Sequence, residues 1–265
     1  MPIVVHADIR RPSQPEFAAI SYDVMHHVFA IHNEFGRFLR EELYKQELAA
    51  RWPGLQLEVP IDVSFDGFTT RYRMDLLADG CALFELKTVD ALTSRHQAQL
   101  LHYLLLAELP HGKLVNMRPD VVEHAFLNTR LRLSDRQQFS VVDDATDTGP
   151  EMRRIKDLVL ALLRDWGTGL ELPLYTEAMT HLAGGAQEVI HEIDVVSGDR
   201  LVGHQKVHMA CPDGIFKITS VDEPGRERFA EHARRFIEHT RLQSLLWINI
   251  SLHQVQFQNI RRQKD

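Results

Sequence analysis

The most informative stretch of the sequence is RYRMDLLADGCALFELK, residues 71–87. Apolar side chains alternate with other residues on both sides of a turn, which predicts two antiparallel strands. The apolar residues that share one face are Tyr72, Met74, Leu76, Ala82, Phe84 and Leu86. The opposite face then holds Asp75, Glu85 and Lys87. A two-residue turn would bury half of these charges, so the pattern favours a three-residue loop that places Asp75 opposite Glu85.

Two facing carboxylates repel each other unless a cation lies between them. Oxygen ligands on a rigid sheet suit a hard divalent ion, Mg²⁺ or Mn²⁺. Lys87 lies two residues beyond Glu85 on the same face, so its ammonium group can reach the same place. The hairpin therefore predicts a divalent-metal site formed by Asp75 and Glu85, with Lys87 beside it.

An Asp followed one strand later by Glu-x-Lys resembles the active-site motif of the PD-(D/E)XK nuclease superfamily. The resemblance extends over residues 20–129 and follows the family named GxxExxY after its helical motif. Glu41-x-x-Tyr44 matches the second half of that motif. The glycine position departs from it, because Phe38 stands there and Gly36 lies two residues earlier.

Further elements follow in the family's order. A strand is expected at residues 58–61, and residues 113–116 supply the closing strand. Between them, a helix over residues 96–104 resembles the Gln-x-x-x-Tyr helix of recombination-type exonucleases through Gln99 and Tyr103. The resemblance implies an α/β fold with a PD-(D/E)XK restriction-endonuclease-like core, in the order αβββαβ, in which helices flank a mixed sheet.

The same resemblance implies roles for individual residues. The implied catalytic residues are Asp75, Glu85, Lys87 and Glu41. The implied metal ligands are Asp75, Glu85, the carbonyl of Leu86, and Glu41. The implied substrate-positioning residues are Gln99, Tyr103 and Tyr44. Mg²⁺ is the implied cofactor, with Mn²⁺ as a substitute, and the implied partner is DNA, with RNA left open.

Each motif also has a purely structural interpretation. Glu41 and Tyr44 would suit a surface pair three residues apart, and Gln99 with Tyr103 a contact along one helix. The nuclease interpretation is favoured because five elements occur in the family's order with compatible lengths.

The composition excludes several classes of protein. The chain has 265 residues, of which 44% are hydrophobic, so it can bury one or two cores. Its net charge of −7 argues against a basic nucleic-acid module. The basic residues expected to face either solvent or phosphate are Arg37, Arg40, Lys45, Arg71, Arg73 and Arg95. Cys81 and Cys211 lie in no Cys-x-x-Cys pattern, so neither a disulfide framework nor a structural zinc site is expected. Without a basic leader or 18 contiguous apolar residues, we expect a cytoplasmic protein that contacts no membrane.

The second half repeats the first in weakened form. Residues 141–150 are polar and rich in turn formers, which is typical of a linker. Three segments of the second half resemble segments of the first. Residues 159–167 resemble 28–36, residues 216–222 resemble 84–90, and residues 246–250 resemble the strand containing 114–117. Their offsets of about 131 to 133 residues indicate internal duplication. We therefore predict a nuclease domain over 1–140, a linker over 141–150 and a degenerate pseudo-nuclease domain over 151–265.

The catalytic residue types are absent from the second copy. Glu41, Glu85, Lys87, Gln99 and Tyr103 correspond there to Leu172, Lys217, Thr219, His232 and Phe236, and the Asp75 region falls in residues 207–209. A site in which one carboxylate is replaced by Lys and another by Leu cannot hold a metal ion.

We expect a Mg²⁺-dependent nuclease that hydrolyses phosphodiester bonds of DNA. A single active site favours single-strand, nicking or end-directed cleavage, and the second copy would complete an intramolecular pseudo-dimer unless the chain forms a homo-oligomer. The alternative is a non-catalytic nucleic-acid-binding or regulatory scaffold with a nuclease fold, which the acidic charge and Phe38 favour. An unrelated metabolic enzyme is disfavoured because no phosphate loop, dinucleotide fingerprint or nucleophile elbow occurs.

Overall fold

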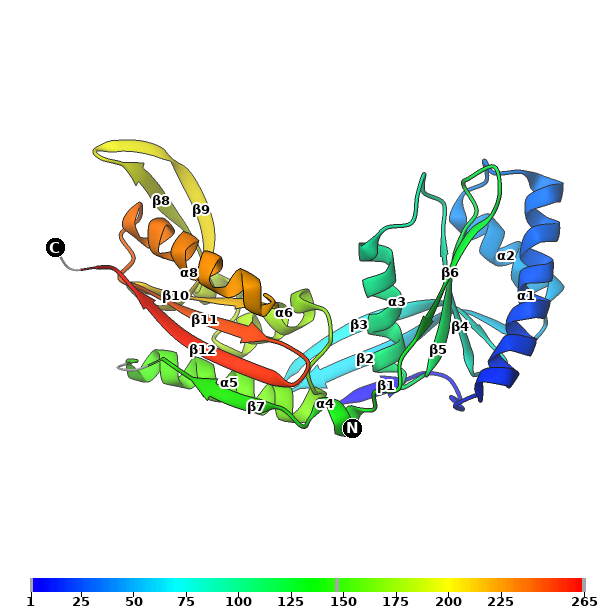
Figure 1. The fold of residues 1–265 in the computed structure, drawn as a ribbon, viewed down its shortest axis with the longest axis horizontal. Coiled ribbons are helices and arrows are strands. Elements are labelled where there is room, and N and C mark those ends of the chain that lie inside the picture. Colours follow the sequence, from blue (N-terminus) through cyan, green and yellow to red (C-terminus); the bar gives the residue numbers. More distant parts are fainter. Residues whose placement is uncertain (1, 146–147, 264–265) are drawn as a thin grey trace. The chain divides into compact units, whose positions relative to one another are not determined.

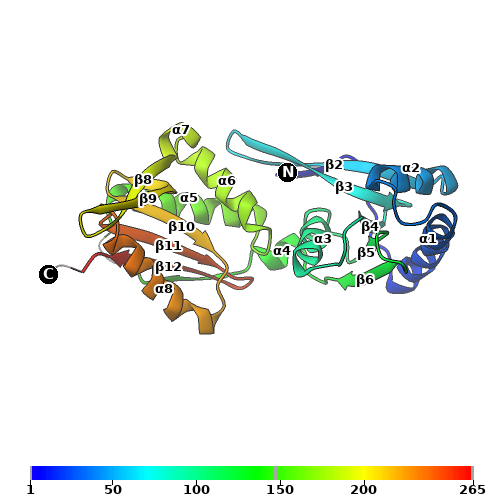
Figure 2. The same cartoon turned by 90° about the horizontal axis from the view of Figure 1, so that it is seen from above.

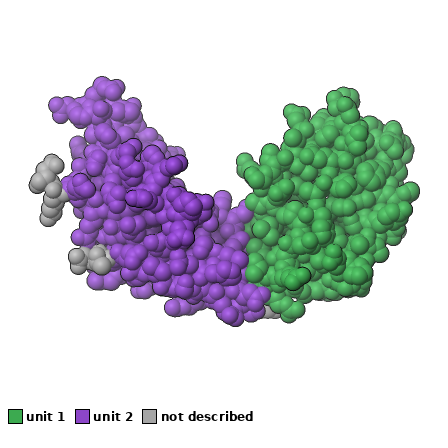
Figure 3. Space-filling view, viewed as in Figure 1, with its two compact units in different colours: residues 1–64, 69–133 green, residues 65–68, 134–265 purple. Residues whose placement is uncertain are grey.

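The computed structural model describes residues 2–145 and 148–263, and the chain forms two compact units (Figures 1 and 3). Unit 1 comprises residues 1–64 and 69–133, and unit 2 comprises residues 65–68 and 134–265. Each unit contains one six-stranded mixed sheet flanked by helices. No helix in the described part of the chain has both the length and the apolar content needed to span a bilayer.

Unit 1 carries the hairpin predicted from the sequence. Its elements are β1 (Ile3–Val5), α1 (Gln14–Phe35), α2 (Glu41–Arg51), β2 (Leu55–Phe65), β3 (Phe68–Ala78), β4 (Ala82–Lys87), α3 (Ser94–Leu106), β5 (His111–Asn116) and β6 (Glu123–Asn128). The strands lie in the order β1-β2-β3-β4-β5-β6, with β4 parallel to β5 and α3 as the crossover between them. Figures 1 and 2 show α1 and α2 on one face of this sheet and α3 on the other.

The β3–β4 hairpin confirms the predicted loop length and register. Leu76 pairs with Phe84 and Ala78 with Ala82, so three residues, 79–81, form the loop. Gly80 has φ = 65°, and a Cβ there would lie 2.5 Å from the carbonyl oxygen of Asp8, so this position requires glycine. Continuing the register by one residue places Asp75 opposite Glu85.

The core of unit 1 lies between this hairpin and the first two helices. Leu76, Phe84 and Leu86 pack against a cluster that includes Phe17 and Val28 of α1. Ser13 and Glu16 form a capping box at the start of α1, and α1 ends at Gly36 (φ = 69°). The alternation that buries Phe84 and Leu86 on this face turns Glu85 to the other.

Unit 2 has its own sheet. Its elements are β7 (Ser140–Asp143), α5 (Pro150–Trp166), α6 (Leu172–Leu182), α7 (Ala186–Val189), β8 (Ile190–Ser197), β9 (Arg200–Cys211), β10 (Gly214–Thr219), α8 (Glu223–Glu238), β11 (Ser244–Ile250) and β12 (Gln254–Arg261), preceded by α4 (Leu133–Arg136) at the boundary. The strands lie in the order β7-β12-β11-β10-β9-β8, with β10 parallel to β11 and α8 as the crossover. Figures 1 and 2 show α5 and α8 on opposite faces.

Unit 2 repeats the order of the helices and of the last five strands of unit 1, but its first strand lies at the other edge, since β1 pairs antiparallel with β2 and β7 pairs parallel with β12. In both, two long helices precede a meander of three strands, a crossover helix and two further strands. The register of the parallel pair is also the same, since Lys87 lies beside Asn116 and Thr219 lies beside Asn249. The offsets found in the sequence, 132 for the first strand and 133 for the second, therefore hold in three dimensions.

Two local hydrogen-bond patterns recur at equivalent positions. The buried Tyr44 hydroxyl donates to the carbonyl oxygen of Gly36 at 2.6 Å, and Tyr175 donates to that of Gly167 at 2.6 Å. The side chain of Asn116 binds both backbone groups of Val89, at 3.1 and 2.8 Å. Asn249 binds Val221 in the same way, at 2.7 and 2.9 Å. The order of these five strands, the register and the polar contacts support the predicted internal duplication.

The predicted linker differs from what the structure describes. Part of residues 141–150 lies in β7, which pairs parallel to β12 at the sheet edge, and α5 begins at Pro150. Residues 146 and 147 lie outside the described part. The boundary between the units falls near Leu133 rather than at residue 140, because β7 satisfies backbone groups that β12 would otherwise leave unpaired at the edge.

Candidate active site

The structure brings the predicted catalytic residues together at the β3–β4 hairpin and the start of α2. Asp75 and Glu85 are 7% and 0% exposed. Lys87 Nζ lies 2.7 Å from Glu85 Oε1 and 3.7 Å from Asp75 Oδ2. The backbone N–H of Leu86 donates to Asp75 Oδ2 at 2.9 Å. Groups of β4 thus hold both carboxylates in place, the Leu86 N–H for Asp75 and the Lys87 ammonium for Glu85.

Glu41 reaches this site through Lys45, one turn later on α2. Lys45 Nζ lies 2.6 Å from Asp75 Oδ1, 2.8 Å from Glu58 Oε1 and 3.0 Å from Glu41 Oε1. Because one ammonium group contacts all three carboxylates, Glu41 and Asp75 are close enough to share one hydrated ion. We refer to Glu41, Glu58, Asp75 and Glu85 as the acidic cluster.

Lys45 has a different place from the one its sequence context suggested. It was expected to face solvent or phosphate, but its side chain is only 7% exposed. Its four-carbon stem is long enough to carry the charge from the helix surface into the acidic cluster. The i,i+4 spacing of Glu41 and Lys45 is the one sequence signal that could have indicated the contact.

Glu58 was also missed as a site residue. It lies in β2 with φ = 51°, a left-handed conformation that is rare for residues other than glycine. Such strained positions persist where the surroundings impose them, and they occur often at functional sites. The sequence predicts a strand here, and nothing in a strand pattern indicates a positive φ.

The charges of the cluster are not balanced within the protein. Burial, followed by the charge of Asp75, raises the pKa of Glu85 to about 8. Burial alone would lower the pKa of Lys87, but the charge and hydrogen bond of Glu85 outweigh it and raise that pKa. Burial alone would also lower the pKa of Lys45, but hydrogen bonds to Asp75 and Glu58 outweigh it and raise that pKa. Both lysines are therefore cations, and Glu85 is the group that takes up a proton when no other cation is near.

The donor set fits a divalent cation. With four carboxylates and two ammonium groups, the ionised cluster has an excess of two negative charges. Glu85 Oε2 is buried and has no hydrogen-bond partner among the described residues. Among the described residues, no group of three His, Cys, Asp or Glu side chains has the spacing of a complete metal site. In the acidic cluster, the ammonium groups of Lys45 and Lys87 lie between the carboxylates. An ion bound by Asp75 and Glu85 would satisfy Oε2 and offset the excess charge.

The three predicted substrate-positioning residues fall into two groups. Gln99 Nε2 lies 3.3 Å from the hydroxyl of Tyr103 on α3, and Tyr103 is 8% exposed. Tyr44 is fully buried, and its hydroxyl binds the Gly36 carbonyl and the Leu39 N–H. The geometry of Tyr44 gives it a structural role, in which it fixes the turn between α1 and α2.

Comparison with known proteins gives a family match over the segment that contains this site. A family model described as the PD-(D/E)XK nuclease superfamily matches residues 18–126, a segment that contains the whole acidic cluster with Lys45 and Lys87. No curated protein and no solved structure matches the chain. Membership of the narrower GxxExxY family stays a prediction. Residues 18–126 belong to the PD-(D/E)XK nuclease superfamily.

Proposed function

We propose that the chain hydrolyses phosphodiester bonds of DNA with a divalent ion, Mg²⁺ or Mn²⁺, held by the acidic cluster of unit 1. The observation that carries this proposal is the convergence of Asp75, Glu85 and Lys87 on one buried spot, where Glu85 Oε2 has no partner in the described part of the protein. The superfamily match over the same segment supports a nuclease-like activity.

A bound divalent ion would supply Lewis-acid polarisation of the phosphate and a lower pKa for a coordinated water. Asp75 and Glu85 are the proposed side-chain ligands, joined by the carbonyl of Leu86 and by Glu41. The Leu86 N–H fixes Asp75 Oδ2, so the orientation of that carboxylate does not depend on the ion. This preorganisation reduces the rearrangement needed when substrate binds.

Lys87 acts in this proposal as a cation that orients the attacking water and offsets charge on the phosphate. Its raised pKa favours this role over that of a general base. Gln99 and Tyr103 on α3 are the proposed contacts to the substrate backbone. Because unit 2 carries Leu172 and Lys217 at the positions of Glu41 and Glu85, we propose one active site per chain and cleavage of single strands, nicks or ends.

Digestion of plasmid and single-stranded DNA with Mg²⁺, Mn²⁺ or EDTA tests the proposal. We expect cleavage with either ion and none in EDTA. Asp75→Ala and Glu85→Ala should abolish cleavage and weaken metal binding measured by calorimetry. Lys87→Ala should abolish cleavage and leave the ion bound.

Asp62→Ala is the matched control, because Asp62 lies on β2 of the same unit and pairs with Arg71 outside the acidic cluster. It should cleave as the wild type does. Undiminished cleavage in EDTA would refute the metal-dependent mechanism. DNA binding without cleavage in either metal would favour the non-catalytic scaffold instead.

A further inference from the structure

Unit 2 contains a cavity of about 390 Å³ between β9, β10 and α8. Its lining includes Val207 of β9, Lys217 of β10, and His232 and Phe236 of α8. These elements are the counterparts of β3, β4 and α3 in unit 1. The cavity is therefore formed by the same three parts of the fold that carry the predicted catalytic and positioning residues of unit 1.

The equivalence extends to single positions. Leu77 pairs with Leu83 in unit 1, and Met209 pairs with Ile215 in unit 2, which fixes the offset on these strands at 132. Val207 and Lys217 therefore correspond to Asp75 and Glu85. On the crossover helices, His232 and Phe236 correspond to Gln99 and Tyr103. All four counterparts line the cavity.

The chemistry of the cavity is opposite to that of the acidic cluster. The exposed Lys217 lines it on the α8 side of the sheet, and no Asp or Glu is among its described lining residues. Lys217 forms no ion pair with any residue that the structure describes.

Aromatic rings complete the lining. Phe229 and Phe236 on α8 are half-buried and border the cavity, and Phe229 is stacked on Trp247 with ring centroids 4.4 Å apart. Partly exposed rings beside unpaired cations are the combination that binds unstacked bases and their phosphates. A duplex keeps its bases stacked and paired, so it offers no base to such a cavity.

We propose that this cavity binds a nucleotide of a single-stranded nucleic acid, with Lys217 at the phosphate and the rings of Phe229 and Phe236 at the base. Its volume is within the range of about 300–1,000 Å³ that is usual for small-ligand sites. The inference rests on the proposed function for the nature of the polymer. It gives the second unit a role in holding substrate that requires no metal.

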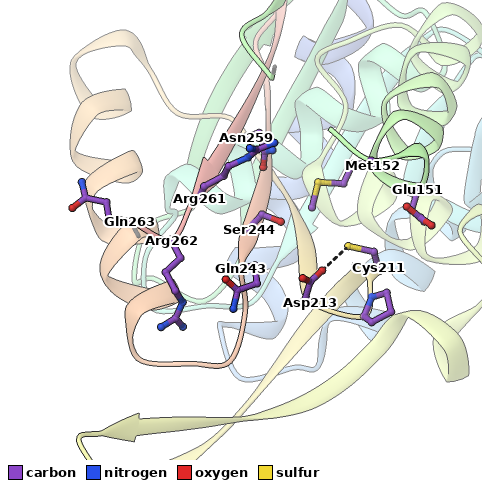
Figure 4. A pocket seen from close by; sticks show the side chains of 12 residues that line it. Glu151, Met152, Cys211, Asp213, Gln243, Ser244, Asn259, Arg261, Arg262 and Gln263 are labelled. Carbon is purple, nitrogen blue, oxygen red and sulfur yellow. Dashed lines mark hydrogen bonds between the residues drawn. The ribbon is translucent and has the colours of Figure 1, made fainter. Parts of the chain in front are cut away.

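A larger cavity in unit 2, of about 810 Å³, lacks this chemistry (Figure 4). Glu151 and Asp213 line it together with Arg261, and Cys211 Sγ lies 3.5 Å from Asp213 Oδ1. No aromatic side chain is among its lining residues in the described chain. Its mixed charges and lack of rings give it no preference for a nucleotide.

Fluorescence anisotropy with a labelled oligothymidylate and the full-length chain in EDTA tests the proposal without cleavage. Lys217→Glu should weaken binding about tenfold at low salt. Lys217→Gln should lower the slope of log affinity against log salt by about 0.7, the value for one phosphate contact on a single strand. Phe236→Leu preserves most of the packing and should weaken binding by roughly fivefold or more through lost stacking.

Arg164→Glu is the matched control, because it makes the same change of charge as Lys217→Glu. Arg164 is exposed on α5 and is not among the residues that line the cavity. It should change affinity less than twofold, and thermal melting by circular dichroism should show all variants folded. Equal losses for Lys217→Glu and Arg164→Glu would overturn the proposal, as would equally effective displacement of the oligonucleotide by polyglutamate. Cleavage of DNA with unchanged oligonucleotide binding by Lys217→Glu would refute this inference alone. Specific binding through Lys217 without cleavage in any metal would refute the proposed function alone.

Discussion

Replacing Lys45 with Met should destabilise metal-free unit 1, although methionine keeps nearly the same length and apolar stem. The substitution removes the ammonium group that contacts Asp75, Glu58 and Glu41 at 2.6, 2.8 and 3.0 Å. Removing one partner of a fully buried ion pair costs about 3–5 kcal/mol, because the other charge stays buried.

Solvent reduces that figure here. The side chains of Asp75 and Lys45 are 10% and 7% exposed, so their pair is close to the buried limit. Those of Glu41 and Glu58 are 27% and 46% exposed, and water can solvate them when the lysine is gone. We therefore expect a loss of about 2–3 kcal/mol in the free energy of unfolding, most of it from Asp75.

Urea denaturation in EDTA, followed by circular dichroism, measures this loss. A saturating divalent ion should restore roughly 2–3 kcal/mol, since an ion at a hundred times its dissociation constant stabilises by about 2.7 kcal/mol. Lys113→Met is the matched control. Lys113 lies on β5 of the same unit, and burial alone lowers its pKa, so its removal should leave stability unchanged or higher. The reasoning would be refuted if Lys45→Met lost no more stability than Lys113→Met.

Three further predictions concern single side chains. The pKa of Glu85 is raised from 4.5 to about 8, so the metal-free folded state holds this proton more tightly than the unfolded chain does. The free energy of unfolding is therefore highest below about pH 4.5 with respect to this group, and it falls as the pH rises to about 8. Glu85→Gln should abolish this slope, which is at most about 1.4 kcal/mol per pH unit, and should exceed wild-type stability at pH 8 in EDTA. Tyr44→Phe and Tyr175→Phe should each cost about 1–2 kcal/mol in urea denaturation, because each hydroxyl donates a 2.6 Å hydrogen bond to a turn carbonyl; unequal losses would argue against equivalent roles. Arg71→Gln breaks an exposed pair with Asp62 and should leave the urea midpoint almost unchanged, with any small difference vanishing in high salt.

The amino-acid sequence alone determined the local features of this protein. Alternation around residues 71–87 was sufficient for the hairpin and its three-residue loop, because a register shift of one residue would have exchanged the sheet faces on which Phe84 and Glu85 lie. The similar segments in the two halves lie 132 and 133 residues apart, and these offsets also predicted that the two parallel strand pairs have matching registers. The superfamily of the first half followed from the order of its motifs.

Only the tertiary structure decided which charges meet. Lys45 and Glu58 are 13 residues apart, and Asp75 is 30 residues beyond Lys45, so no local pattern relates them. Their contact depends on how α2 packs against the sheet and on the left-handed backbone at Glu58. The boundary near Leu133 likewise depends on the pairing of β7 with a strand more than a hundred residues later. Periodicity reports which face of an element is buried, but the partner on that face is chosen by packing between elements distant in sequence.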